Sequence, residues 1–290
     1  MITMYDAMTL SLAFAALSMV GFGCVDVIAF LLSRQVNPRI VPLWTTTLSV
    51  IFLGIGLFFF PFPSLSITNM ILLIVGSAIG VIALIAFYKG LNLGKISVVV
   101  PIANVWPLIA VPISIFVLHE SLNPDEAIGI FLAIIGTALV SLKYDDVIKL
   151  KFNKLAAGAK FALITMVGWG VFYTAVGFLS QSLGWFWSTE LAQIGVCIFM
   201  LFYLISTKTG IGFPMQAKGK FVLFGILLAV SFISYSISTN LGYVAITAPI
   251  TGSSPLVTVL LGMFLLKERV EKSQFAGILL IVVGIALITL

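Results

Sequence analysis

The sequence predicts an all-α integral membrane protein in which ten transmembrane helices form two inverted five-helix repeats around a central cavity. Three observations predict this fold class: the composition, the length of the apolar runs, and an internal duplication. Of the 290 residues, 61% are hydrophobic and only 9% are charged, and the mean hydropathy is +1.23. A soluble domain carries charge on about a quarter of its residues, so this chain cannot cover itself with charge.

The apolar runs are about 20 residues long, which is the length that a helix needs to cross a bilayer core. Ten spans are predicted at residues 9–32, 39–60, 66–88, 94–118, 124–142, 155–181, 185–206, 218–240, 243–266 and 271–290. Little sequence lies outside them, so we expect no soluble domain. Only Asp6 is charged before the first run, which is also too long for the core of a signal peptide, so we expect this run to remain as a span.

The basic residues predict the orientation of the spans. All 15 lysines and arginines fall on one side of a strict ten-span alternation: Arg34, Arg39, Lys89, Lys95, Lys143, Lys149, Lys151, Lys154, Lys160, Lys208, Lys218, Lys220, Lys267, Arg269 and Lys272. Basic residues favour the cytoplasmic side, so both termini are expected outside the cell. The same residues form no patch or stripe, which argues against a nucleic-acid partner.

A duplication divides the chain into two halves. Residues 92–140 and 240–288 align without gaps and share 17 of 49 residues. The motif MVGFG at 19–23 also returns as MVGWG at 166–170. We therefore expect one repeat at 1–145 and a second at 146–290. Because each repeat has five spans, the second enters the membrane from the opposite face, as in alternating-access transporters with a substrate site near the midplane.

Two spans, the fourth and the ninth, carry prolines at matched positions. The pairs are Pro101 with Pro249 and Pro107 with Pro255. A proline frees a backbone carbonyl, and in lipid that is tolerated only where protein or a watery cavity receives the freed group. A static kink in a packed helix is one interpretation, and a broken helix beside a cavity is the other. Matched prolines beside Asn104 and Ser254 favour the cavity.

The order of these features resembles the EamA-type transporters of the drug/metabolite transporter superfamily, over essentially the whole chain. Each half ends in a proline-containing helix, a glutamate (Glu120 or Glu268) and a final Gly-x6-Gly helix. The stretch NVWP at 104–107 is similar to the equivalent helix of the aromatic amino-acid exporters. The resemblance implies export or exchange of amino acids, metabolites or drugs without ATP hydrolysis. Characterised members keep both termini in the cytoplasm, whereas the charges of this chain predict both outside.

Polar and aromatic residues on matched helix faces define the expected substrate site. A stripe on the sixth span and its equivalent 147 positions earlier on the first span supply most of it. On a straight helix Asn104 and Trp106 would point about 200° apart, and the neighbouring prolines are expected to change that. The predicted substrate-binding residues are Ser18, Phe22, Asp26, Asn104, Trp106, Trp169, Tyr173, Tyr235 and Ser254.

Asp26 is the most informative of these residues. A carboxylate inside a span costs about 2.5–3.5 kcal/mol even on lenient insertion scales, so it should face protein or water. Three roles stay open: binding a substrate ammonium group, carrying a coupling proton, or pairing statically with Lys89 or Arg34. Glu190 and Gln193, one turn apart in the seventh span, are expected near its outer end in a vestibule or helix-end role.

The predicted function is a secondary transporter that exports or exchanges an amino-acid-like zwitterion or an organic cation by alternating access. A drug, sugar or nucleoside transporter and a passive channel are the alternatives. With one histidine, ten acids and no metal-ligand spacing or nucleophile–base pair, a membrane enzyme is disfavoured, and we expect no catalytic residue, metal or cofactor. The expected partners are a small-molecule substrate and the lipid bilayer, for a monomer or homodimer in the inner or plasma membrane.

Overall fold

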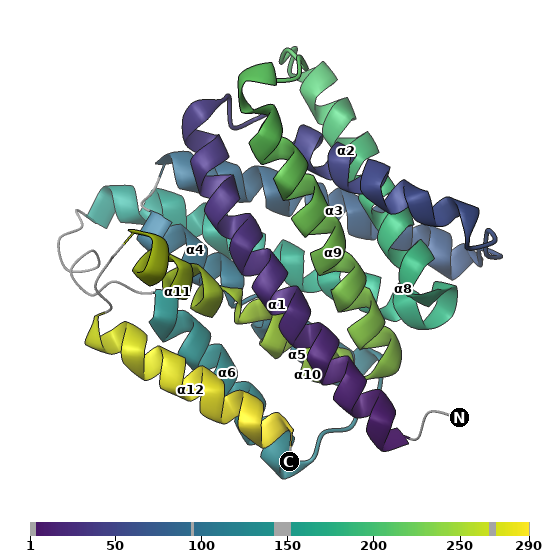
Figure 1. The fold of residues 1–290 in the computed structure, drawn as a ribbon, viewed down its shortest axis with the longest axis vertical. Helices are drawn as coiled ribbons and strands as arrows, with labels where there is room; N and C mark the ends of the chain where they lie inside the picture. The colour runs from purple at the N-terminus through teal and green to yellow at the C-terminus, as the bar shows by residue number, and fades with distance from the viewer. Residues whose placement is uncertain (1–3, 94–95, 142–151, 267–270, 290) are drawn as a thin grey trace.

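The computed structural model describes residues 4–93, 96–141, 152–266 and 271–289, and their regular structure is entirely helical. Figure 1 shows these helices crossing at the centre of the molecule. The elements are α1 (Met4–Gln35), α2 (Val41–Leu53), η1 (Gly54–Phe58), α3 (Ile67–Leu93), α4 (Ile96–Asn104), α5 (Pro107–Val117), α6 (Pro124–Ser141), α8 (Phe152–Ser206), η2 (Met215–Ala217), α9 (Lys218–Leu241), α10 (Val244–Gly252), α11 (Ser254–Leu266) and α12 (Lys272–Ile288).

The length and surface of these helices are those of a multi-pass membrane protein. Six helical segments in the described part of the chain are long and apolar enough to cross a bilayer, and Ile102–Val117 and Lys272–Ile288 are shorter apolar helices. Large apolar side chains lie on the outer surface, among them Phe58, Phe116 and Phe264, each more than three-quarters exposed. Such a surface suits lipid rather than water.

Two helices of the predicted pattern are joined as α8, which is 55 residues long and would extend for about 80 Å if it were straight. It is broken at Gly184, whose φ of 78° and ψ of 159° lie outside the helical region. A positive φ is readily adopted only by glycine, because it has no Cβ. The chain therefore changes direction at this glycine, within α8.

The fourth and ninth predicted spans are each broken into two short helices. The first break separates α4 from α5 at residues 105 and 106, and Pro107 begins α5, where a missing N–H is tolerated. The second separates α10 from α11 at Ser253. The breaks meet: a Cβ on Gly252 would lie 2.5 Å from Cγ of Pro107 and 3.4 Å from the carbonyl oxygen of Asn104.

Glycines let α6 and α12 approach backbone to backbone. A Cβ on Gly129 would lie 2.6 Å from the carbonyl oxygen of Gly284, and a Cβ on Gly136 would lie 2.8 Å from that of Gly277. In the repeat, Gly277 is the equivalent of Gly129, and Gly284 is the equivalent of Gly136. The two contacts are therefore related by the repeat, because exchanging each glycine for its equivalent turns one contact into the other. Small residues at such spacing are typical of close helix packing in membranes.

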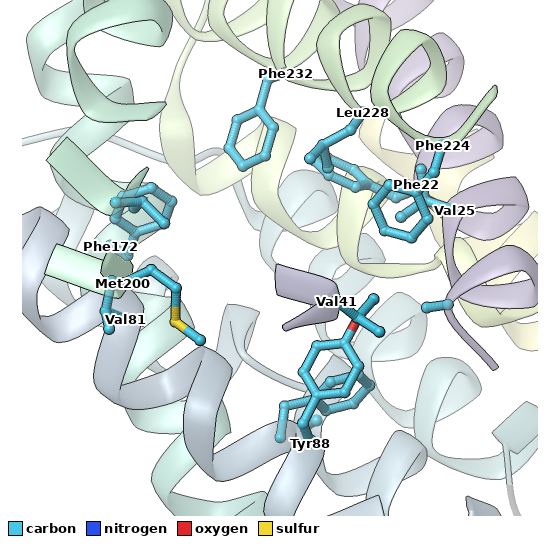
Figure 2. Close-up of a cluster of buried hydrophobic side chains, with 14 of the residues drawn as sticks. Phe22, Val25, Val41, Val81, Tyr88, Phe172, Met200, Phe224, Leu228 and Phe232 are labelled. Carbon is cyan, nitrogen blue, oxygen red and sulfur yellow. The ribbon is translucent and has the colours of Figure 1, made fainter. Parts of the chain in front are cut away.

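The main apolar core lies between α1, α2, α3, α8 and α9. Figure 2 shows its side chains reaching inward from separate helices, with Phe22, Leu228 and Phe232 on one side of a space and Tyr88 on another. A smaller apolar cluster packs against the N-terminal half of α1, and it contains Ala15, Val111, Ala245 and Ile246. The core therefore surrounds a space near the helix breaks, and the smaller cluster lies beside one end of it.

Candidate functional site

A cavity of about 110 Å³ lies where the broken helices meet the long ones. Its walls come from α1, α2, α3, α8 and α9, and the two helix breaks supply Asn104, Trp106, Thr251 and Ser254. The walls are largely apolar with a few polar groups, which is the usual character of a small-molecule site. Part of this lining is visible in Figure 2.

Asp26 brings a carboxylate to the cavity from α1. The hydroxyl of Ser254 lies beside this carboxylate and donates to Oδ1 of Asn104 at 3.3 Å. A serine has one proton to donate, so these two acceptors compete for it. The Oδ2 atom of Asp26 is buried and has no hydrogen-bond partner. Leaving a buried polar atom unpaired is costly, so this oxygen marks the place where a donor from a solute or ion would be stabilised.

The two cations that were candidate partners of Asp26 contact aromatic rings. The guanidinium of Arg34 lies 5.1 Å from the centre of the Phe30 ring, and Nζ of Lys89 lies 4.7 Å from the centre of the Phe161 ring. Both distances are typical of cation–π contacts. This geometry disfavours a static ion pair as the role of Asp26.

Aromatic side chains form a second wall of the cavity. The ring of Tyr173 stacks on Trp106 at 4.5 Å between centroids and on Phe232 at 5.6 Å. Phe22 meets both Tyr173 and Phe232 edge-on. Stacked and edge-to-face rings add about 0.5–1.5 kcal/mol per pair beyond their buried area, so this wall is held in shape before any solute arrives.

The structure brings seven of the nine predicted site residues to the cavity: Phe22, Asp26, Asn104, Trp106, Trp169, Tyr173 and Ser254. Asn104 and Trp106 both reach it because the helix is interrupted between them and α5 begins only at Pro107. Ser18 and Tyr235 do not line it. The hydroxyl of Ser18 donates to the carbonyl of Ser231, and the hydroxyl of Tyr235 donates to the carbonyl of Tyr173, both at 3.0 Å.

Other polar lining residues were missed from the sequence, namely Tyr88, Thr45, Thr46, Gln193 and Thr251. Gln193 was expected near an outer vestibule, but it is only 2% exposed and lines the cavity. The spacing of 147 residues that matches Asp26 to Tyr173 also matches Thr46 to Gln193. Extending the repeat to the second and seventh spans would therefore have found this pair.

Comparison with known proteins gives the family. The sequence profile of the EamA-like transporter family matches residues 9–142 and again residues 156–290. The chain belongs to the EamA-like transporter family. An uncharacterized transporter of Archaeoglobus fulgidus is 23% identical to this EamA-like protein over 248 residues, covering 83% of this chain and 84% of the relative.

Two further matches extend the comparison. An uncharacterized protein of Methanocaldococcus jannaschii is 41% identical over 69 residues, which are 24% of this EamA-like chain and 50% of that protein. A solved crystal structure has a TM-score of 0.75 at 18% identity and covers 97% of this chain and 96% of that one, which shows a shared fold. The family and the archaeal relative indicate that this EamA-like protein is a membrane transporter rather than an enzyme.

Proposed function

We propose that this protein is a secondary transporter for a small zwitterion or organic cation with an apolar side chain. The observation that carries the proposal is the cavity in which an unpaired carboxylate oxygen of Asp26 lies among stacked aromatic rings. Asp26 would bind the cationic group. Trp106, Trp169 and Tyr173 would hold the apolar part, or the cation itself, at about 0.5–2 kcal/mol for each π contact.

The proposed architecture is ten spans in two inverted halves, residues 1–145 and 146–290. It is supported by the family match in each half and by equivalent contacts at equivalent glycines. A Cβ on Gly23 would lie 2.8 Å from the carbonyl oxygen of Ser254, and a Cβ on Gly170 would lie 2.9 Å from that of Trp106. The repeat pairs Gly23 with Gly170 and Asp26 with Tyr173. One half would thus supply the acidic part of the site and the other half the aromatic part.

Access to the cavity is proposed to alternate between the two membrane faces. The lining residues of α1 and α3 lie from the middle of these helices onward and those of α2 in its first half, for example Ala29, Tyr88 and Thr45, whereas Phe232 lies just past the middle of α9. Those parts of α1, α2 and α3 lead to the basic loops that are predicted to be cytoplasmic. In the proposed orientation the cavity would therefore lie toward the cytoplasmic side of the bundle.

Several polar contacts close the opposite end. The carboxylate of Glu120 accepts hydrogen bonds from the backbone N–H groups of Val244 (2.9 Å) and Ala245 (2.8 Å), at the start of α10. The hydroxyl of Ser238 donates to the carbonyl of Ser11, and the hydroxyl of Ser11 donates to the carbonyl of Ser238. These contacts support an inward-facing state with a closed outer end. Glu268, the repeat equivalent of Glu120, lies outside the described residues.

Purified protein in proteoliposomes tests the proposal. A thermal-stabilisation screen over amino acids, sugars, nucleosides and cationic drugs would first select a solute. We expect saturable uptake with counterflow, and we expect Asp26→Asn to abolish uphill transport without loss of membrane insertion. Flux that rises linearly with concentration and shows no counterflow would indicate a passive channel. Selection of sugars or nucleosides, with no effect of Asp26→Asn, would contradict the proposed substrate class.

A further inference from the structure

We propose that Glu190 binds the coupling proton of this transporter, at a site separate from the cavity carboxylate Asp26. The inference rests on the proposed function and assigns the two buried acids different tasks. Asp26 would meet the solute, and Glu190 would take up and release a proton as the outer end of the bundle opens and closes.

The position of Glu190 is unusual for a charged residue. It lies in the part of α8 that follows the break at Gly184, and only 1% of its surface is exposed. Its Oε2 atom is buried without a hydrogen-bond partner. Ionisable residues inside membrane helices are rare, and by default they mark ion or proton pathways.

A polar path connects Glu190 with the cavity. Phe186, Glu190, Gln193 and Cys197 follow one another at spacings of four, three and four residues, so they share one face of α8. That face packs on α2 and η1, because Phe186 contacts Gly56 and Sγ of Cys197 lies 3.1 Å from Oγ1 of Thr47. Glu190 therefore lies between these two contacts, one turn before Gln193, which lines the cavity.

Glu190 is not the only residue of α8 and α2 with an unpaired buried polar atom. The amide nitrogen of Gln193 has no hydrogen-bond partner, and neither has the hydroxyl of the fully buried Ser49 on α2. Buried polar groups in proteins are nearly always hydrogen-bonded to protein or to ordered water. Gln193 and Glu190, one turn apart on the same face, thus offer a donor and an acceptor for water molecules, through which a proton could move between cavity and carboxylate.

Within the described residues, the surroundings of Glu190 provide no cation to hold it charged. The helices α2 and η1 contain no ionisable side chain. The ionisable side chains of α9 are Lys218, Lys220 and Tyr235. Lys218 and Lys220 lie in the first turn of α9, where Nζ of Lys220 donates to Oε1 of Gln35, and the hydroxyl of Tyr235 donates to the carbonyl of Tyr173. The ionisable side chains of α3 are Tyr88, which lines the cavity, and Lys89, which contacts the Phe161 ring. An unpaired carboxylate there is disfavoured, so the group is expected to hold a proton in this inward-facing state.

The chemistry needs only reversible protonation. The carboxylate accepts one proton from water to give the carboxylic acid, and it returns that proton when water reaches it from the other side. No other bond changes. Because Asp26 would remain free for the solute, solute and proton would not compete for one carboxylate. Loss of the Glu190 proton site should therefore abolish coupling and leave exchange of solute intact.

Four variants in proteoliposomes test this separation: Glu190→Gln, Glu190→Asp, Asp26→Asn and, as a control, Asp125→Asn, which removes an exposed acid in the first turn of α6. Uptake of radiolabelled phenylalanine and methyl viologen is measured under a pH gradient and, separately, as counterflow at equal pH. We expect Glu190→Gln to retain counterflow within about twofold, below the ~1.4 kcal/mol of a tenfold change. It should lose accumulation driven by the gradient. Glu190→Asp should regain part of that drive, and Asp26→Asn should lose both activities.

Infrared spectroscopy supplies a readout that needs no solute. The carboxylic-acid band of the protein in lipid is recorded over a pH series, and Glu190→Gln should remove a band that titrates. Gradient-driven accumulation by Glu190→Gln at the wild-type level would overturn the inference, and so would the absence of a titrating Glu190 band. If no solute moves through the wild type in any mode, the transporter proposal fails. The infrared titration still decides in that case whether Glu190 exchanges a proton.

Discussion

Replacing Glu120 should open the outer end of the bundle. Its carboxylate, 7% exposed, accepts the backbone N–H groups of Val244 and Ala245, the first two residues of α10. A hydrogen bond to a charged group contributes about 1.5–3 kcal/mol, so two such bonds amount to ~3–6 kcal/mol. Water entering the opened end would recover part of this. We therefore expect Glu120→Ala to destabilise the closed outer end by ~2–4 kcal/mol, since orphaned N–H groups at a helix start can be solvated once exposed.

This magnitude implies a large change in exposure. At ~1.4 kcal/mol for each factor of ten, the expected loss shifts the equilibrium between closed and open outer ends by roughly 30-fold to 700-fold. The assay places a cysteine at Ala15, which is fully buried in the outer apolar cluster, in a background without Cys24 and Cys197. Its rate of modification by an impermeant maleimide added outside reports the opening.

Two control variants test whether the effect comes from the Glu120 hydrogen bonds or from the loss of any acid at this end. Glu120→Gln keeps one oxygen acceptor but loses the charge, so its labelling rate should lie between those of the wild type and Glu120→Ala. Glu126 lies at the same end of the bundle, in the first turn of α6, and accepts the N–H of Asn123 just before that helix at 2.7 Å. Glu126→Gln should leave the rate unchanged. Equal labelling in the wild type and Glu120→Ala, or an equal rise in Glu126→Gln, would refute the reasoning.

Three further predictions concern the aromatic wall, a strained backbone and the membrane orientation. Trp169→Ala should weaken solute affinity about tenfold (~1.4 kcal/mol), whereas Trp185→Ala, away from the cavity lining, should not; equal losses in counterflow would indicate general destabilisation. His119 has a φ of 58°, so His119→Gly should raise the thermal stability by up to ~1–2 kcal/mol, and a lower melting temperature would contradict this. A single cysteine at Asn123 should react with an impermeant reagent added outside, whereas a single cysteine at Lys218 should react only with a reagent added inside. The reverse pattern would overturn the orientation.

The helix breaks show what the sequence could predict. A proline excludes a backbone hydrogen bond wherever it stands, so the matched prolines Pro107 and Pro255 located the two interruptions that bring Asn104 and Ser254 to the cavity. The missing N–H of a proline and the clash of its ring with the preceding turn are local effects, and they act before any helix packs against another. This is why the two interruptions could be predicted from one sequence.

The remaining polar residues could not be assigned in this way. A hydroxyl on the inner face of a helix can point into a cavity or donate to a carbonyl of a neighbouring helix, and Ser18 and Tyr235 do the latter. Which of these happens depends on how far two helices approach. The position of Gln193 in the cavity wall was likewise not predicted, because spacing along the chain gives the face of a helix but not what covers it.

The stack of Trp106 on Tyr173 has an optical consequence. Of the five tryptophans, Trp106 and Trp169 line the cavity. The indole N–H groups of Trp44 and Trp187 donate instead to the carbonyls of Ile211 and Pro61. A solute that enters between the aromatic rings must replace water or ring contacts at the cavity pair first. Intrinsic fluorescence of the unlabelled protein would thus contain a signal from the proposed solute site.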